Sequence, residues 1–481
     1  MDDRISELPD DILSYILAML LIKDLLKTSV LSKRWSKLWG RRKDLYFDIH
    51  NVLGSEKELI ETGHLIDVTD VYCVNLDLSL KEFVKRVDQF VKNFPGTAID
   101  SFSVNFYLGC EQSNTIDRWI SFAIARGVER INLLFLGKPY GRYCTTRDKD
   151  YKFDFALFSE TNVSTIKHLR LENCLVCHPT DCDFTPFKHL RSLSLKRVKV
   201  DEILIESLLS NCRLLEELCL HYCLFKSSMP KIVSSSLYHL KVLGCSKPYY
   251  INAARYTRFV DLMLVDCLKL TSLDCWGSDL SALNIYNTHV LRRIDFSVSF
   301  KEYLDVFALC ATFPELEIMR VEIFYTTVTT SLKIAQPLKH LKQLEFVLGL
   351  YGLSSDEDCD LMVVLNILQA SPLLQKLSVM LEAPILFEEQ KDIRDVEVFS
   401  HDELKVIEFG GCVGNWFEIE FVMNVLKYAH KLEQIVVSPY WKSSYSLDWK
   451  SNPVWFQSGR ERMIEKLQGE EVVGREKLVF I

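Results

Sequence analysis

The chain has 481 residues, of which 48% are hydrophobic and 25% charged, a balance typical of a folded protein too long for one compact core. Its formal net charge of −8 provides no basic excess to neutralise phosphates, which argues against a nucleic-acid partner. The start is acidic and the apolar run at 13–22 is too short to span a bilayer, so neither an export signal nor a membrane partner is predicted. The 15 scattered cysteines favour reduced thiols in the cytoplasm or nucleus.

Residues 3–47 predict a bundle of three short helices. One face of the first helix would carry Ile12, Leu13, Ile16, Leu17 and Leu20. Pro9 suits the first turn, and Asp10-Asp11 places negative charge where the helix dipole favours it. A second helix is expected over 24–30 and a third from about residue 32. About 45 residues bury too little surface to be very stable alone, so some apolar surface should remain for a partner.

The order of short motifs in this region resembles the F-box of plant proteins. The motifs are Leu8-Pro9, Lys23-Asp24, Thr28-Ser29-Val30-Leu31-Ser32 and Lys33-Arg34-Trp35. One departure stands at Leu20-Leu21-Ile22, where the family often has Leu-Pro, and it bears on how the first helix ends. The resemblance implies contact with a Skp-type adaptor through Leu8, Pro9, Ile12, Leu13, Ile16, Asp24, Leu25, Ser29, Val30, Leu31, Arg34 and Trp35.

Beyond residue 47 a leucine, one residue and another apolar residue recur as a unit. The clearest copies begin at Leu169, Leu193, Leu218, Leu240, Leu262 and Leu283, at intervals of 21 to 25 residues. This period and pattern are the signature of leucine-rich repeats. Weaker copies begin at Leu45, Phe102, Ile131, Ile294, Met319, Leu344, Leu377, Ile407 and Ile435.

Cysteines support the repeat interpretation. Each of five lies three residues after the second apolar position of its copy, where leucine-rich repeats hold Asn or Cys. These are Cys174, Cys223, Cys245, Cys267 and Cys412. Free cysteine behaves as a small buried hydrophobe, so we expect these thiols to point inward where the chain leaves each strand.

The predicted fold class is α/β, with an F-box over 1–47 and a leucine-rich-repeat solenoid over 48–369. The solenoid would present a curved parallel sheet, with helices and loops on its convex side. Residues 370–440 resemble the FBD region that follows such repeats in many plant proteins, and would form terminal repeats or a cap. Residues 441–481 are polar, and we expect a tail that is partly ordered at most.

Within each strand the leucines should point inward and the intervening residues outward. The alternative is that most of these outward side chains are merely solvated. The candidates for contact with a protein substrate are His168, Arg170, Glu172, Ser194, Lys196, Glu217, Cys219, His221, His239, Lys241, Asp261, Met263 and Tyr286.

Motifs for catalysis or nucleotide binding are missing from the sequence, and no cofactor is expected. Zinc could bind at Cys174, Cys177, His178 and Cys182, with His189 close by, but the second C-x-x-C of a zinc site is missing, so no metal is predicted. The basic residues of 33–43 are either a nuclear address or the solvated face of the third F-box helix.

Together the two resemblances imply a non-catalytic substrate receptor of an SCF-type ubiquitin ligase. The F-box would dock on a Skp-type adaptor, which links to a cullin and a RING subunit, and the repeats would bind the substrate protein. Two alternatives stay open: a co-receptor for a small-molecule signal held by the repeats, and a repeat scaffold that has lost ligase coupling.

Overall fold

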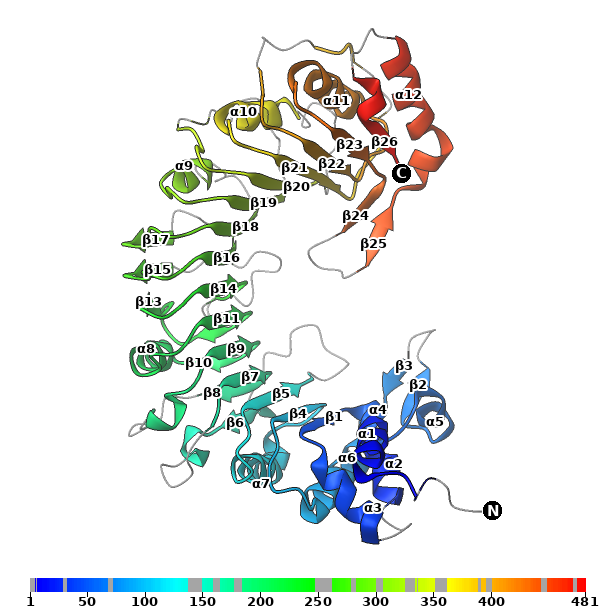
Figure 1. The fold of residues 1–481 in the computed structure, drawn as a ribbon, viewed down its shortest axis with the longest axis vertical. Coiled ribbons are helices and arrows are strands. Elements are labelled where there is room, and N and C mark those ends of the chain that lie inside the picture. The colour runs from blue at the N-terminus through cyan, green and yellow to red at the C-terminus, as the bar shows by residue number, and fades with distance from the viewer. Residues whose placement is uncertain are drawn as a thin grey trace. The chain divides into compact units, whose positions relative to one another are not determined.

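A computed structural model gives the fold (Figure 1). It describes residues 5, 7–28, 33–67, 72–136, 149–158, 165–176, 184–246, 262–277, 283–299, 306–324, 334, 336–350, 361–387, 391–394, 400–442, 448–469 and 474–481. The chain forms two compact units. Unit 1 is Met1–Leu237 with Cys245–Asn252, and unit 2 is Tyr238–Gly244 with Ala253–Ile481.

Unit 1 begins with the short helices that the sequence predicts. They are α1 (Asp10–Met19), α2 (Ile22–Thr28), α3 (Lys33–Leu38) and the 3-10 turn η1 (Trp39–Arg41). Helix α2 begins two residues earlier than expected. A small core between these helices buries Leu13, Leu17, Ile22, Leu25, Trp35, Leu38 and Trp39. The F-box is therefore a helical cluster packed onto the rest of unit 1 rather than a separate unit.

The main sheet of unit 1 is parallel and follows chain order. Its strands are β1 (Asp44–Phe47), β4 (Ser101–Phe106), β5 (Arg130–Phe135), β7 (His168–Glu172), β9 (Ser192–Lys196) and β11 (Glu217–His221). Their register aligns one buried row of Leu45, Phe102, Ile131, Leu169, Leu193 and Leu218. Every upstream copy of the repeat pattern is thus confirmed, including the weak ones.

Other elements of unit 1 complete the repeats. A second parallel sheet runs β12 (Leu224–Phe225), β10 (Lys199–Val200), β8 (Cys174–Val176) and β6 (Tyr151–Phe153). The helices are α4 (Ile49–Val52), α5 (Glu56–Glu61), α6 (Leu76–Asn93), α7 (Ser113–Ile124) and α8 (Glu202–Asn211), and the short strands are β2 (Leu65–Asp67), β3 (Tyr72–Val74) and β13 (Lys231–Val233). Helix α6 buries residues spaced by one and two turns, Phe83, Val87 and Phe90, as an amphipathic helix does.

Unit 2 has the same plan. Its main parallel sheet runs β14 (His239–Leu243), β16 (Ser272–Gly277), β18 (Arg293–Ser299), β19 (Ile318–Phe324), β20 (Gln343–Gly349), β21 (Lys376–Glu382), β22 (Val406–Gly410), β23 (Gln434–Val437) and β26 (Leu478–Phe480). The helices are α9 (Val306–Ala311), α10 (Met362–Ala370), α11 (Trp416–Tyr428) and α12 (Arg460–Gly469), and β24 (Tyr440–Lys442) pairs antiparallel with β25 (Trp449–Ser451). The downstream copies from Ile294 to Ile435 all lie in the main sheet, as predicted.

Two predicted copies of the main-sheet strand are wrong. Strands β15 (Leu262–Val265) and β17 (Leu283–Tyr286) pair with each other in a separate sheet. The main-sheet strand of this region is β16, whose Leu273 and Cys275 are buried. Because Leu262 and Leu264 are also buried, the same alternation of apolar and polar residues marks both kinds of strand. Alternation reports that one face is covered, and not which sheet the strand joins.

The cysteine prediction is confirmed. All five predicted thiols are buried, and the residue before each has a positive φ, between 51° and 73°. This left-handed turn aims the chain under the sheet, and Gly244 and Gly411 occupy two of the turns. The Cys223 thiol lies 3.3 Å from the Leu195 carbonyl oxygen and donates to it. A small side chain that can donate weakly to a carbonyl suits the slot.

The expectation of a partly ordered tail is wrong for the residues described there. β26 pairs with β23 and extends the main sheet. Trp455 is 1% exposed and donates its indole N–H to the Ile481 carbonyl at 3.2 Å. A Cβ built on Gly459 would lie 2.2 Å from the Val413 carbonyl oxygen, so only glycine permits this close approach. The polar composition predicts little order, but contacts with residues distant in the sequence order the described part of this segment.

The ordering of residues 448–469 and 474–481 through Trp455 can be tested by limited proteolysis. Replacing Trp455 with Ala removes a fully buried indole, a change that destabilises a packed site by about 3–5 kcal/mol. We expect Trp455→Ala to release this segment to proteases while the rest of the chain stays protected. Trp449→Ala, at an exposed tryptophan, should cleave like the native protein. Equal protection of both variants would contradict this role for Trp455.

Candidate functional site

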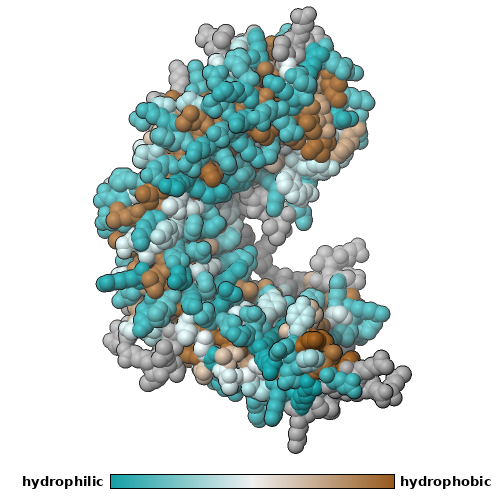
Figure 2. All heavy atoms as spheres, in the orientation of Figure 1, coloured by the Kyte–Doolittle hydropathy of each residue, from teal (hydrophilic) through white to brown (hydrophobic). Residues whose placement is uncertain are grey.

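One face of helix α1 is apolar and uncovered. Ile12, Tyr15 and Met19 are 47%, 66% and 67% exposed and lie at i, i+3 and i+7, along one stripe of the helix. Figure 2 shows hydrophobic surface over the part of unit 1 where Figure 1 labels α1. A helix face in contact with water usually carries polar residues, so this apolar face is a candidate for docking a partner.

The residues predicted for adaptor contact divide into distinct environments. Leu13, Leu25 and Trp35 are buried in the F-box core, where they support the exposed face rather than form it. Half-buried positions are Leu8, Ile16 and Asp24, and exposed ones are Pro9, Ile12 and Arg34. Ser29, Val30 and Leu31 lie outside the described residues. Tyr15 and Met19 were not among the predicted residues, although their helical spacing from Ile12 places them on the same stripe.

The basic residues of 33–43 hold the F-box helices together. The guanidinium of Arg34 pairs with Asp10 at 2.6 Å and donates to the Leu8 carbonyl at 2.7 Å. Arg41 pairs with Asp11 at 2.9 Å. Arg42 donates to the Leu20 carbonyl at 3.1 Å, and burial lowers its pKa. These side chains tie α3 and η1 to α1 and its C-terminal end, which favours the structural reading of the cluster over a nuclear address.

The departure from the F-box pattern at Leu20-Leu21-Ile22 is accommodated by a neighbouring side chain. Proline has no N–H, whereas Ile22 has one at the first turn of α2, where no helical carbonyl is available. Asn51 Oδ1 accepts this N–H at 2.8 Å, and Asn51 Nδ2 donates to the Tyr46 carbonyl. Asn51 therefore joins an F-box helix to strand β1, and the F-box fold is retained.

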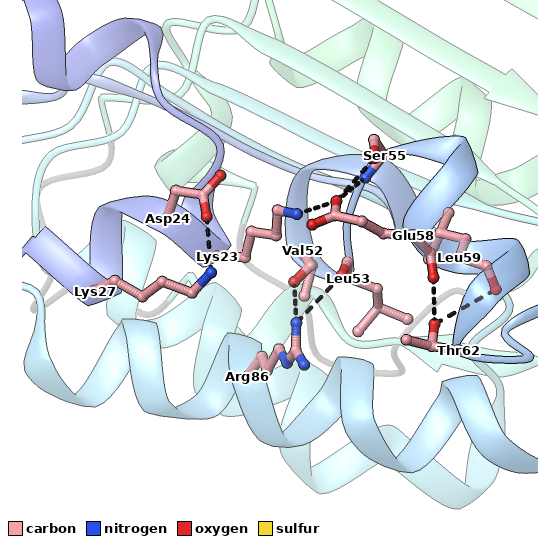
Figure 3. A network of polar contacts seen from close by, with 10 residues as sticks. All are labelled: Lys23, Asp24, Lys27, Val52, Leu53, Ser55, Glu58, Leu59, Thr62 and Arg86. Carbon is pink, nitrogen blue, oxygen red and sulfur yellow. Dashed lines mark hydrogen bonds and ion pairs between the residues drawn. The ribbon is translucent and has the colours of Figure 1, made fainter.

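An ion pair joins α2 to α5 at the same junction. Figure 3 shows Lys23 reaching Glu58, which also accepts hydrogen bonds from the Ser55 N–H at 2.8 Å and the Ser55 hydroxyl. These donors, Lys23 first, lower the pKa of Glu58 to about 2. Arg86 of α6 donates to the Val52 carbonyl at 3.0 Å. The Glu58 carboxylate thus ties the F-box to the first repeat, and Arg86 ties α6 to α4 beside this contact.

Aromatic rings fill the junction beneath these polar contacts. The Trp39 ring lies 5.0 Å from Phe90 and 5.6 Å from Phe94, both edge-to-face. Phe90 also lies 5.3 Å from Phe47 of β1. Edge-to-face pairs contribute about 0.5–1.5 kcal/mol each beyond the area they bury. The F-box and the first repeat therefore share one hydrophobic core.

The sheet face of unit 1 gathers most of the residues predicted for substrate contact. In register across β7, β9 and β11 lie the rows His168–Ser192–Glu217, Arg170–Ser194–Cys219 and Glu172–Lys196–His221. Glu172 and Lys196 pair at 2.9 Å. Burial first, then the charges of Lys196 and Arg197, lower the pKa of His221 to about 4. His221 is therefore neutral near pH 7.

The remaining substrate candidates belong to unit 2 and are only partly placed on its main sheet. His239 and Lys241 lie on β14 and are exposed. Met263 and Tyr286 lie on β15 and β17, in the separate sheet, so their predicted place on the main-sheet face is wrong. Asp261 lies outside the described residues. Asp274, on the main-sheet strand β16, was not among the predicted residues, because the sequence pattern did not indicate that strand.

The alternative of a zinc site is not supported by the residues that the structure describes. Cys177, His178 and Cys182 lie outside them, Cys174 is buried in the repeat core, and His189 is exposed. Within the described ranges no group of three His, Cys, Asp or Glu side chains is arranged to hold a metal ion. In the same ranges no helix is both long and apolar enough to cross a membrane.

Comparison with known families places this architecture. The F-box domain model matches residues 5–46, and the model described as At1g61320/AtMIF1, LRR domain, matches residues 90–469. The chain belongs to the plant F-box/leucine-rich-repeat family. This assignment agrees with the helical cluster at the start of unit 1 and the parallel sheets that follow.

Relatives of the family in Arabidopsis thaliana share this organisation. The F-box/FBD/LRR-repeat protein At1g13570 is 25% identical over 453 residues, 91% of each chain. A putative F-box/FBD/LRR-repeat protein, At3g49030, is 28% identical over 61% of this chain and 60% of its own. Among solved structures, an internalin of Listeria monocytogenes matches with a TM-score of 0.27 at 14% identity, covering 66% of this chain and 76% of that one, which is too low to inform the fold.

The family assignment supports an F-box substrate-adaptor role, with binding of a Skp-type adaptor through the F-box. The matched family models describe an F-box and a repeat domain. The F-box/leucine-rich-repeat protein therefore has two surfaces to assign, the exposed stripe of α1 and the polar faces of its sheets.

The Lys23–Glu58 contact predicts a pH-dependent stability. Because the pKa of Glu58 falls from 4.5 to about 2 on folding, its contribution is full above pH 4.5 and is lost as the pH drops toward 2. We expect Glu58→Gln to lower the melting temperature at pH 7, with the difference from the native protein shrinking between pH 4.5 and 2. Calorimetry would measure this. Glu61→Gln, which breaks a looser pair with Lys57 at 3.9 Å, should change little at any pH.

Proposed function

We propose that this chain is the substrate-recognition subunit of an SCF-type ubiquitin ligase. Its F-box docks on a Skp-type adaptor, which connects it to a cullin and a RING subunit, and its repeats bind a protein substrate. The chain itself would make and break no bond. It contributes proximity, because a bound substrate experiences a high local concentration of activated ubiquitin.

The observation that carries the proposal is the exposed stripe of α1. Ile12, Tyr15 and Met19 present a branched, an aromatic and an unbranched side chain on one helical face, the anchors of a helix-in-groove contact. The opposite face of α1 is closed by Leu13 and Leu17, which are buried. One face of α1 is thus packed on the F-box core, and the other is exposed, as docking on an adaptor requires.

The rigid junction gives this docking a consequence for the substrate. Asn51, the Lys23–Glu58 pair and the Trp39 ring cluster fix the F-box to the first repeats. Substrate bound on the sheet face of β7, β9 and β11 would then keep one orientation relative to the adaptor. A defined orientation presents the same lysines to the ubiquitin-carrying enzyme at each encounter.

The alternative of a scaffold without ligase coupling rested on the Leu20-Leu21-Ile22 departure. Since Asn51 satisfies the Ile22 N–H and α1 keeps its open apolar face, this departure no longer favours it. The small-molecule alternative predicts a thermal shift on ligand addition in the native chain. Substrate reception remains the function that the described surfaces support best.

Adaptor binding by the α1 stripe can be tested by co-purification and by titration with a Skp-type adaptor. The double variant Ile12→Asp/Met19→Asp places two carboxylates in the proposed contact, and we expect the dissociation constant to rise at least about 30-fold. Ile203→Asp is the matched control, since Ile203 is 55% exposed on α8 and lies away from the stripe. This control should bind like the native chain.

Folded native chain that forms no complex with any Skp-type adaptor would reject the ligase-receptor proposal and leave a repeat scaffold. Equal loss in the double variant and in Ile203→Asp would place the contact elsewhere. Circular dichroism of all three proteins establishes that the compared chains are folded.

A further inference from the structure

Two exposed arginines lie side by side on the polar face of the unit 1 sheet. Arg130 is on β5 and Arg170 on β7, the two middle strands of that sheet (Figure 1). Their neighbours Ile131 and Leu169 are buried, so the arginines point to the opposite, solvated face. Arg130 is in register with His168, two residues before Arg170, which makes the arginines diagonal neighbours.

The carboxylates nearest to these arginines along the chain are held by lysines. Glu129 pairs with Lys167 at 2.6 Å, and Glu172 pairs with Lys196 at 2.9 Å. Among the residues that the structure describes, no carboxylate lies within ion-pair distance of either arginine.

The other acids of this face lie at its two sides. Asp44 is on β1 and Glu217 on β11, each two strands from the nearer arginine, or about 10 Å across the sheet. Over the six strands, acidic and basic side chains of this face are equal in number, but the middle of the face holds the two arginines.

The histidines of the face experience this positive charge. Burial is the largest cause that lowers the pKa of His168, and Arg130 lowers it further. Burial and then the neighbouring cations, Arg170 among them, lower the pKa of His221 to about 4. A positive potential over the middle of a surface attracts a negatively charged partner.

Hydrogen-bond donors surround Arg170. It is in register with Asn132 on one side and Ser194 on the other. Ser192 and Ser194 are half-buried, and their hydroxyls make no hydrogen bond to the described part of the chain. Asn132 donates one amide N–H to the Ser103 hydroxyl at 2.8 Å, and its second remains for a ligand. These short side chains leave the guanidinium accessible.

Arginines elsewhere in unit 1 have carboxylate partners. Arg118 pairs with Asp88 at 3.1 Å, and Arg191 pairs with Glu216 at 2.7 Å. Such pairs join helices or neighbouring repeats. The two arginines in the middle of the sheet face make no such link within the described structure, although the chain has 65 acidic residues and a net charge of −8.

We propose that the Arg130–Arg170 face binds an acidic segment of the protein substrate. The face consists of Arg130, Asn132, Arg170, Ser192 and Ser194. A carboxylate can accept two parallel N–H groups from Arg170 and a hydroxyl from Ser194. Side chains two residues apart on an extended segment are separated by about 7 Å, close to the spacing of diagonal strand neighbours, so a second carboxylate can reach Arg130. This inference rests on the proposed function, whose substrate class it specifies.

The full-length chain can be titrated against a defined probe by fluorescence anisotropy. The probe is the fluorescein-labelled peptide Gly-Asp-Gly-Asp-Gly-Asp-Gly, at about 0.15 M salt where distant charges are screened. Replacing its Asp residues with Asn keeps the shape and removes the charge, and we expect binding at least about tenfold weaker. Equal binding of the Asp and Asn peptides would overturn the proposal. Binding of a phosphoserine peptide without binding of the Asp peptide would also overturn it.

Charge variants localise the binding. Arg170→Gln should weaken binding of the Asp peptide about fivefold to thirtyfold, the effect of one charged hydrogen-bond donor. Glu217→Gln removes a negative charge from the same face and should strengthen binding about twofold, an effect that misfolding cannot produce. Arg213→Gln changes the net charge as Arg170→Gln does, but Arg213 is exposed in the turn before β11, and binding should stay unchanged. Equal effects of the two arginine variants would overturn the assignment to this face.

Adaptor binding measured on the same preparations separates the two proposals. Asp-peptide binding that follows the variants, together with a native chain that does not bind the adaptor, would reject the ligase function and retain a face for acidic segments. Adaptor binding without discrimination among the peptides would reject the face and retain the ligase function.

Discussion

The structure depends on in-register stacking of apolar side chains that no single repeat can bury alone. Leu45 begins one buried row and Leu240 another, and each following strand adds one residue at the same level. Each such side chain stabilises the fold by about 1.5–3 kcal/mol, an upper range because unfolded chains are already partly compact. In a parallel sheet, each connection must run from the end of one strand back to the level where the next strand starts. The left-handed turns before the buried cysteines begin that connection.

A stack of this kind has two ends that need covers, and both covers bear on function. At the start, the F-box helices close the first repeat through Trp39 and Asn51, and this contact uses up one side of the helical cluster. The side left over is the apolar stripe of α1. At the finish, β26 and the segment around Trp455 extend the sheet of unit 2. One side of the F-box helices covers the first repeat, and the opposite side carries the stripe proposed for docking.

The polar faces of the sheets carry ion pairs that join neighbouring repeats. Exposed one-to-one ion pairs such as Glu317–Lys342 recur where strands begin. They disfavour a shifted strand register, because such a shift would bring like charges together. Arg320 of β19 lies between three carboxylates, those of Asp295, Glu322 and Glu345, and joins β18, β19 and β20 in the same way.

The sequence by itself determined the F-box, the repeat class, the buried cysteines and nearly every main-sheet strand, because these follow from local motifs and from the period of two that burial imposes. Tertiary structure alone decided that β16 rather than β15 or β17 joins the main sheet, since alternation cannot name the neighbouring strand. It also decided that Tyr15 and Met19 stay exposed and that residues 448–469 and 474–481 are ordered. These outcomes depend on which residues distant in the sequence pack against each other. The spacing of residues along the chain does not specify those contacts.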